Sequence, residues 1–567
     1  MGKHCLFSFY FSLCFSFSAL HAGTLPADSA EQIPDLDKIY APVVVGVSPC
    51  DAYVGLAKME NGEWRHYNYG ENASTDKPMY LYSRDNGKSW QTQFLPKDLP
   101  YADQKSPVSG EYIRIFTSRS AVYALRTEGG LEGGRHIVKI DNKLGIMNKP
   151  PIFIRGGKRV ISAAHRTDRS GAYVYYSDDD GRTWKISQQV NAPKHEKHGF
   201  HQGIRWNHGA VEPTVVELKD GRLWMIMRTA QDKHYQSFST DGGETWCEPT
   251  PSPFYGTITM PTLYRMEDGR LLFFWCNTTP LPELPTATGV WDDVFTNRDA
   301  VHVAISEDDG KTWKGFRELM LNTERNSNRF GNTVSGQDKS VHQVQAVEVS
   351  PGKILVSAGQ HAQCRRMLVF DVAWLYEPVR SNDFSDGLQQ WSAFRYYKGI
   401  VGHCSYNRQE EALIVAHPDR PEDKVMKIGY VPNDSLLQDN EGAVWNFPAA
   451  KDGFVSLRIK LPEGAKNVDL VLNDRWFNPT DTVARYQCMY TLPVNRKQLK
   501  IRDDKWHTVT VDWQKNHHAV VRVDGKKRGT LPLVSPTEHG ISYLHLLGGK
   551  VLDKVGIFIE QVEGGNR

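Results

Sequence analysis

The chain has 567 residues, of which 40% are hydrophobic and 24% are charged, a composition typical of a folded globular protein. Its 68 Lys and Arg residues nearly balance its 66 Asp and Glu residues, for a formal net charge of +2. Nucleic acids and anionic membranes select clustered positive charge, so this balance argues against a dedicated nucleic-acid-binding protein or a polybasic membrane clamp. The length predicts about two to four domains.

The first 22 residues have the pattern of a secretory signal peptide. A short basic start precedes an apolar stretch from Cys5 to Leu20, and Ala22 is a small residue where a signal peptidase can cut. The stretch is too short and too rich in serine for a membrane span, and no later stretch approaches about 20 consecutive apolar residues. We therefore predict a secreted or periplasmic protein without a membrane span.

One pattern, S-x-D-x-G-x-[ST]-W, occurs four times. The copies occupy residues 83–90, 177–184, 239–246 and 306–313. Each follows a short alternating or aromatic run, which predicts a hairpin turn. In such a turn the Asp carboxylate accepts backbone N–H groups, the Gly takes a positive φ, and the Trp packs beneath.

Successive copies start 94, 62 and 67 residues apart, a spacing that suits one four-stranded sheet with long loops per repeat. Repeated four-stranded units around a common axis form a β-propeller. We therefore predict an all-β fold, with about six propeller blades in residues 35–378.

A hairpin within this region carries the strongest chemical signal. Glu212 precedes one predicted strand, Asp220-Gly221 makes the turn, and Arg228 ends the returning strand. A hairpin brings its two ends together, so Glu212 and Arg228 are expected to be neighbours at one rim. On this evidence the pair is either an ordinary surface ion pair or part of a ligand site.

Histidines before this hairpin are further candidates. Four of them occupy the segment that leads into Glu212: His195, His198, His201 and His208. The spacing can hold a metal, but no matching carboxylate or cysteine pattern supports one, so neither a metal site nor a cofactor is predicted. These histidines can still line a substrate pocket, and His165-Arg166 is another candidate without a motif.

Residues 380–567 are predicted to form a second domain. Alternating strand signals at residues 506–511 and 519–523, followed by the turn Asp524-Gly525, favour a jelly-roll β-sandwich. The segment resembles the concanavalin-type and laminin-G-type domains. The resemblance implies either carbohydrate binding or packing against the propeller, of which packing is preferred.

The repeated turn pattern resembles the Asp box of the sialidase (neuraminidase) superfamily. The resemblance implies a six-bladed propeller with its boxes on outer turns, away from the active site. It also implies that Glu212 is the base that activates the nucleophile, and that Arg228 is one of three arginines that bind the substrate carboxylate. Arg298, shortly before the last box, fits another of these positions. The planar guanidinium suits this task because it binds a carboxylate with two parallel hydrogen bonds.

The N-terminal part of the chain departs from the family pattern. Residues 41–51 lack the Arg-Ile-Pro motif that supplies the first arginine in sialidases. The family's acid/base aspartate precedes the first box, where Glu71, Asp76 and Asp51 are the candidates, none of them in a recognisable motif.

The tyrosine nucleophile of the family is also missing. The best correspondence places His342 or Gln343 at its position. His342 can act as a general base or acid because its ordinary pKa is near neutral, or it can be a buried structural histidine. Both interpretations carry equal weight.

The sequence therefore predicts a secreted, exo-acting glycoside hydrolase of sialidase type, whose partner is a glycan or polysaccharide with an acidic sugar. Sialic acid is the first candidate, and another acidic or 2-keto sugar is the next. Glu212 and His342 are the expected catalytic residues, and Arg228 and Arg298 the expected substrate-binding residues. Two alternatives stay open: a polysaccharide lyase in which an arginine neutralises a uronate and a histidine abstracts the α-proton, and a non-catalytic glycan-binding propeller.

Overall fold

The computed structural model describes most of the chain, and the structural statements below refer to that part. The described residues are 33–47, 55–68, 79–94, 104–118, 120–128, 133–147, 149–196, 205, 209–279, 298–326, 340–361, 364–401, 405–408, 413–430, 439–477, 487–515, 517–548 and 553–567. The predicted signal peptide, residues 1–22, lies outside these ranges. In the described part, no helix combines the length and apolar character needed to cross a membrane.

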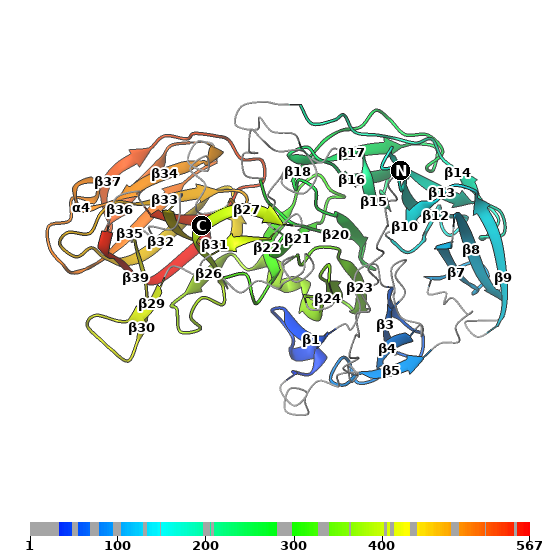
Figure 1. Cartoon of the computed structure of the whole chain (residues 1–567), viewed down its shortest axis with the longest axis horizontal. Coiled ribbons are helices and arrows are strands. Elements are labelled where there is room, and N and C mark those ends of the chain that lie inside the picture. Colours follow the sequence, from blue (N-terminus) through cyan, green and yellow to red (C-terminus); the bar gives the residue numbers. More distant parts are fainter. Residues whose placement is uncertain are drawn as a thin grey trace, which may run out of the picture.

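The chain folds into a six-bladed β-propeller followed by a β-sandwich (Figure 1). The first two blades contain β2 (Leu56–Lys58), β3 (Trp64–Asn68), β4 (Met79–Ser83) and β5 (Gln91–Phe94), and then β6 (Gln104–Lys105), β7 (Tyr112–Ser118), β8 (Ala121–Glu128) and β9 (Gly134–Asp141). The third blade contains β10 (Gly145–Met147), β11 (Ile152–Ile154), β12 (Arg159–Arg166), β13 (Ala172–Ser177) and β14 (Lys185–Ile186).

The last three blades complete the ring. The fourth contains β15 (Val211–Glu217), β16 (Leu223–Arg228), β17 (Lys233–Ser239) and β18 (Thr250–Tyr255). The fifth contains β19 (Thr262–Arg265), β20 (Leu271–Trp275), β21 (Ala300–Ser306) and β22 (Lys314–Leu321). The sixth contains β23 (Gln345–Ser350), β24 (Lys353–Ala358), β25 (Arg366–Asp371) and β1 (Val43–Val47), with η1 (Leu36–Lys38) and η2 (Val372–Tyr376) nearby in the chain.

The sixth blade closes the propeller with strands from both ends of this region. β1 pairs antiparallel with β25, with Val43 opposite Val369, so the first strand in the chain is the outermost strand of the last blade. This pairing joins the two ends of the propeller region through hydrogen bonds within the sixth blade.

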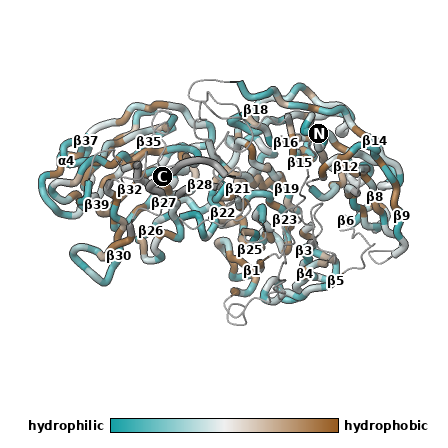
Figure 2. The backbone as a smooth tube through the Cα atoms, in the orientation of Figure 1, coloured by the Kyte–Doolittle hydropathy of each residue, from teal (hydrophilic) through white to brown (hydrophobic). Residues whose placement is uncertain are grey.

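The blades pack on one another through strands that are apolar on both faces. All of β20, with the sequence Leu-Leu-Phe-Phe-Trp, is buried, and so is β16. Strands covered on both faces form near-continuous hydrophobic runs rather than an alternating pattern. Figure 2 shows these runs inside the sheets, with hydrophilic residues gathered at the outer turns.

The four repeated turns have the predicted structure, and each joins the third and fourth strands of its blade. In the box at 177–184, Gly181 N donates to Ser177 Oγ at 2.8 Å, and Thr183 N donates to the Asp179 carboxylate at 2.8 Å. Gly181 has a φ of 82°. The same Gly-to-Ser hydrogen bond, also at 2.8 Å, occurs in the other three boxes. The prediction of a hairpin turn with a positive-φ glycine is confirmed.

The C-terminal part is a sandwich of two antiparallel sheets. One sheet contains β26 (Val379–Asn382), β29 (Leu413–Ala416), β30 (Lys424–Tyr430), β32 (Gly453–Lys460), β35 (Trp506–Trp513), β36 (Ala519–Val523), β37 (Lys526–Leu531) and β39 (Asp553–Asn566). The other contains β27 (Trp391–Val401), β28 (Ser405–Arg408), β31 (Asp439–Ala450), β33 (Val468–Asn473), β34 (Tyr490–Val494) and β38 (Ile541–Gly548), and the short helix α4 (Arg496–Leu499) follows β34. Between the sheets lies one apolar core that includes Trp391, Trp445 and Trp513.

The sandwich packs against the fifth blade through a buried polar network. Tyr543 of the sandwich donates to the Glu318 carboxylate at 2.8 Å, and it also hydrogen-bonds with His302 Nε2. Asn277 N donates to His302 Nδ1 at 3.1 Å, so the ring proton is on Nε2 and His302 donates to the tyrosine hydroxyl. Buried polar groups need such partners, and the network therefore fixes the sandwich in one position on the propeller. Carbohydrate binding by the sandwich stays an untested alternative to this packing role.

Candidate active site

The predicted site residues lie at the rim of the propeller opposite the Asp boxes. Glu212 is the second residue of β15, the inner strand of the fourth blade, and Arg228 is the last residue of β16. In an up-and-down blade, the start of the inner strand and the end of the second strand share one rim. The turn between the third and fourth strands, here the box at 239–246, belongs to the other rim.

Glu212 and Arg228 form a buried ion pair. Arg228 Nη1 lies 2.9 Å from Glu212 Oε2, and the two residues are only 7% and 5% exposed. Burial disfavours the ionised carboxylate, but the Arg228 guanidinium outweighs burial and holds the pKa of Glu212 well below its usual range. Glu212 is therefore ionised at neutral pH.

The backbone at Glu212 adopts a conformation that L-residues rarely take. Its φ is 47°, in the left-handed region, and the pairing of β15 with β16 is irregular between Val211 and Thr214. Glu212 N donates to His165 Nδ1 of the third blade at 3.2 Å. Such strain, of order 1–3 kcal/mol, persists only where the surroundings determine the conformation, and it clusters at functional sites.

His165, the penultimate residue of β12, is thereby a neutral acceptor. Burial lowers its pKa to about 4, and its Nδ1 accepts from Glu212 N, so the ring proton is on Nε2. His165 thus contacts the strained segment of the fourth blade from the end of the third blade's second strand.

Arg298 and His342 form a second buried group on the same rim. Arg298 Nη1 lies 3.3 Å from His342 Nε2 and donates to Gln360 Oε1 at 3.3 Å, while its Nη2 donates to the Ile258 carbonyl at 2.5 Å. His342 interacts electrostatically with Glu212 and Arg228, so the two groups face a common space. Both Arg298 and His342 are 1% exposed.

Hydrogen bonds occupy both ring nitrogens of His342. Met260 N donates to Nδ1 at 3.3 Å, which leaves the proton on Nε2, 2.8 Å from Gln360 Oε1. Burial, together with the neighbouring Arg298, lowers the pKa of His342 to about 3. The ring is therefore neutral near pH 7 and presents an N–H rather than a free lone pair. Its catalytic role stays a prediction.

The rim carries more positive than negative charge. Arg365, fully buried and just before β25, donates to Ser357 Oγ at 2.9 Å, and Lys149 interacts electrostatically with both Arg365 and Glu212. Asp299, next to Arg298, is the second buried carboxylate of this region. Three buried arginines and a lysine thus accompany two buried carboxylates in this region, an imbalance that favours an anionic ligand.

The guanidinium of Arg228 has donors left for such a ligand. Only its Nη1 contacts Glu212, and its buried Nε has no hydrogen-bond partner among the described residues. Buried donors are normally paired, so an unpaired Nε at a rim with excess positive charge favours an incoming acceptor. A carboxylate can bind a guanidinium fork through two parallel hydrogen bonds.

Several candidates cannot be placed. Outside the described residues lie Asp51, Glu71, Asp76, His198, His201 and His208. His195 is described and is buried. Among the described residues, no group of three or more His, Cys, Asp or Glu side chains is arranged to hold a metal ion.

Sequence reasoning missed Gln360 and Lys149, and it gave His165 no role. His165, Arg228 and Gln360 share one place in three different blades, at or just after the end of the second strand. Aligning the second strands of the repeats would have found this shared place. Lys149 has no such signal, because it lies in a break of its own inner strand, between β10 and β11.

Two family models match the chain. Residues 134–350 match the BNR repeat-like domain, and residues 81–92 match the BNR/Asp-box repeat. The second match contains the first of the four boxes, and the first match contains the other three.

Solved structures with a similar arrangement include a protein of unknown function from Dyadobacter fermentans and a sialidase from Trypanosoma rangeli. The former has 17% identity and a TM-score of 0.39, and the match covers 59% of this chain and 97% of that one. The sialidase has 12% identity and a TM-score of 0.34, with 91% of both chains covered, and its complex with sialic acid has 13% identity and a TM-score of 0.35 over the same shares. The four Asp boxes and the two matched family models make the chain similar to BNR-repeat proteins over residues 81–92 and 134–350.

Proposed function

We propose that this protein is a glycan-processing hydrolase of sialidase type that removes a terminal sugar bearing a carboxylate. Arg228 carries the proposal, because its buried guanidinium is held by Glu212 on one side only and keeps an unpaired Nε. Arg298 supplies a second guanidinium on the same rim. Sialic acid is the first substrate to test, and another acidic or 2-keto sugar is the next.

Glu212 is proposed as the base. In the ligand-free site its carboxylate is a weak base, because Arg228 holds its pKa low. A substrate carboxylate that binds Arg228 competes for this guanidinium, so binding raises the pKa of Glu212 and makes it a better proton acceptor. Substrate binding thus makes Glu212 a stronger base for the hydrolysis of that substrate.

In the proposed step, water attacks the anomeric carbon and gives its proton to Glu212, while the glycosidic C–O bond breaks and the leaving oxygen takes a proton from an acid. Asp51, Glu71 and Asp76 remain the candidates for that acid. His342 is proposed to turn its Nε2–H from Gln360 to the substrate when substrate binds, because its pKa of about 3 and its Nδ1 contact with Met260 make it a poor base. The N-terminal signal pattern supports export of the enzyme.

The test is release of a fluorophore from an N-acetylneuraminic acid glycoside by the wild-type protein and two matched variants. Arg228→Lys keeps the charge beside Glu212 but loses the planar fork, and Glu212→Gln keeps the shape but loses the base. We expect Arg228→Lys to raise KM, and Glu212→Gln to lower kcat by about 100-fold or more.

Other outcomes separate the alternatives. Binding of the free sugar without turnover would replace the hydrolase with a glycan-binding propeller. An ultraviolet-absorbing product from a uronate polysaccharide would replace it with a lyase. No binding of any acidic sugar would overturn the proposed function.

A further inference from the structure

We propose that Lys149 is a positioning residue that spans the centre of the propeller and holds the Arg298–His342 half of the site in place relative to the Glu212–Arg228 half. The inference concerns a part of the molecule that no sequence motif marked. Its ligand-binding consequence rests on the proposed function, whereas its structural consequence does not.

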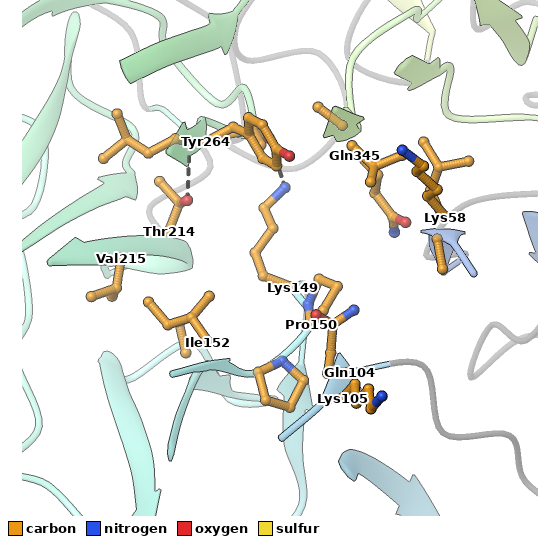
Figure 3. Close-up of a pocket in the computed structure, with 18 of the residues that line it drawn as sticks. Lys58, Gln104, Lys105, Lys149, Pro150, Ile152, Thr214, Val215, Tyr264 and Gln345 are labelled. Carbon is orange, nitrogen blue, oxygen red and sulfur yellow. Dashed lines mark hydrogen bonds between the residues drawn. The ribbon is translucent and has the colours of Figure 1, made fainter. Parts of the chain in front are cut away.

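Lys149 reaches across the ring because its own strand is interrupted. It lies between β10 and β11, the two halves of the third blade's inner strand, and Pro150 and Pro151 follow it. Proline has no N–H for a strand ladder, so the two prolines account for the break in the strand. Figure 3 shows the Lys149 side chain extending from this break toward the strand that carries Tyr264.

The ammonium binds two other blades. Lys149 Nζ donates to Thr262 Oγ1, at the start of the fifth blade, at 2.6 Å, and to the Val344 carbonyl, just before β23 of the sixth blade, at 2.9 Å. In a ring of six, the third and sixth blades face each other across the axis. The Lys149 side chain is therefore a cross-link through the centre of the propeller.

The two segments that Lys149 joins are the ones that hold Arg298 and His342. Thr262 Oγ1 itself donates to the Val344 carbonyl at 2.9 Å, which ties the two segments at one end. At the other end, Met260 N donates to His342 Nδ1. The Ile258 carbonyl, on the same segment as Met260, accepts from Arg298.

A charged side chain at position 149 must do more than fill the space between the blades. Burying an ammonium group costs free energy, whereas burying the side chain of a methionine or leucine does not. Two charge-assisted hydrogen bonds offset that cost and fix the distance between segments, which an apolar side chain cannot do.

A cavity of about 350 Å³ lies farther along the inner strands than the site residues, on the far side of Lys149. Its walls include Thr214 and Val215, which follow Glu212 in β15, and Gln345 to Val347 of β23, a strand that begins three residues after His342. Lys149 therefore stands between this cavity and the rim.

The charges that face Lys149 explain its ionisation. Burial lowers the pKa of Lys149 to about 7, with Glu212 opposing and Arg365 adding to the shift. The titratable groups that line the cavity below it are Lys58, Glu60, Lys105, Tyr112 and Tyr264. As pH rises through neutral, the Lys149 ammonium thus loses its proton, and the neutral amine forms weaker hydrogen bonds with the same two acceptors.

The experiment compares Lys149→Met with Lys58→Met, a matched loss of an exposed lysine that lines the same cavity. The first readout is amide hydrogen exchange at Met260, Val341 and Gly359, whose N–H groups bond His342 Nδ1, the Arg298 carbonyl and the His342 carbonyl. We expect exchange to be about tenfold faster or more in Lys149→Met, with no change in Lys58→Met, because each 1.4 kcal/mol of local stability is a factor of ten.

The second readout is the affinity for free N-acetylneuraminic acid from pH 5.5 to 8.5. We expect Lys149→Met to weaken binding by about 10–100-fold, as losses of supporting contacts around a site typically do. The affinity of the wild-type protein should also fall as pH rises through about 7. This fall should be larger than any change of affinity with pH that the Lys149→Met variant shows.

If Lys149→Met does not fold, Thr262→Val removes the hydroxyl bridge while keeping the lysine, and it should accelerate the same three amides. Unchanged exchange at these amides in a folded variant would overturn the inference. If the wild-type protein binds no acidic sugar, the proposed function fails, and the exchange data alone still decide the role of Lys149.

Discussion

The two rims of the propeller are built from opposite kinds of contact. On the Asp-box rim, the hydrogen bonds that recur from box to box join residues two to four positions apart, such as Ser177 with Asp179 and with Gly181. On the site rim, hydrogen bonds join residues that are distant in the chain: Glu212 with His165 across 47 positions, and Lys149 with Val344 across 195. One rim is a repeated local structure, and the other exists only once the ring has closed.

The difference has a consequence for charge. Each box forms the same hydrogen bonds among its Ser, Asp and Gly residues within one octapeptide, so the same turn recurs in four blades. The site rim retains an excess of buried positive charge, which a folded state can hold only where contacts from several blades oppose its cost. A positive φ at non-glycine residues occurs on both rims: Asn86, Asp180 and Asp309 adopt it inside a box turn, whereas Glu212 and Gln343 adopt it at the site.

The largest effect should come from breaking the ion pair on the site rim. Arg228→Met leaves the Glu212 carboxylate buried without its guanidinium, which we expect to cost about 3–5 kcal/mol. Urea-induced unfolding measures the loss. The double variant Arg228→Met/Glu212→Met should regain most of the stability without regaining sugar binding, and a double variant as unstable as the single one would contradict the role given to the pair.

A variant at the interface between propeller and sandwich tests whether a long-range hydrogen-bond network outside the site rim also stabilises the fold. Tyr543→Phe removes the hydroxyl between His302 and Glu318, and leaving these buried groups unsatisfied should cost about 1–3 kcal/mol. A thermal unfolding scan checks this loss. An unchanged Tm would mean that this network adds nothing to the docking of the sandwich.

On the Asp-box rim the effect should be smaller and local. Asp241→Ala removes an acceptor for Glu244 N and Thr245 N, and we expect it to cost about 1 kcal/mol while leaving sugar affinity unchanged.

The pH dependence of Asp241 has a definite sign. Although burial opposes ionisation, hydrogen bonds within the box lower the pKa of Asp241 from 3.8 to about 2. Its stabilisation is therefore complete above pH 4 and is lost as pH falls toward 2. Acid unfolding of the wild type should be steeper than that of Asp241→Ala, and parallel curves would argue against it.

A separate effect should be a slope of stability against pH at alkaline pH. The pKa of Lys149 is about 7 in the folded protein and near its usual 10.5 in the unfolded chain. Between these values the unfolded state binds more protons, so stability rises with pH there. Stability curves measured from pH 7 to 10 should rise more in the wild type than in Lys149→Met, and equal slopes would contradict the assigned pKa.

The sequence was a good guide wherever structure is local or repeated. The boxes identified the propeller, because the same local Ser–Asp–Gly hydrogen bonds recur in four of the blades. The hairpin from Glu212 to Arg228 predicted their contact, because Asp220-Gly221 places the two strand ends together and the observed distance is 2.9 Å.

The sequence could not show which tautomer His342 adopts or what surrounds it. That depends on Met260 N, 82 residues away, and on Gln360, which follows a different strand. Gln360 and Lys149 had no motif because their roles come from where the closed ring places them. The docking of the sandwich was equally hidden, since the hydrogen bond between Tyr543 and Glu318 spans 225 positions.

By itself, then, the amino-acid sequence determined the all-β class, the box turns, the repeated blades and the pairing of Glu212 with Arg228. Each of these follows from contacts over a few residues, or across one hairpin, where closing the loop costs little entropy. The tertiary structure alone decided the closure of the ring by β1, the neutral state of His342, the course of the Lys149 side chain through the centre of the propeller and the position of the sandwich on the propeller. Those features need residues from opposite ends of the chain, and only the burial gained when the blades and the two domains pack together offsets the entropy of bringing them into contact.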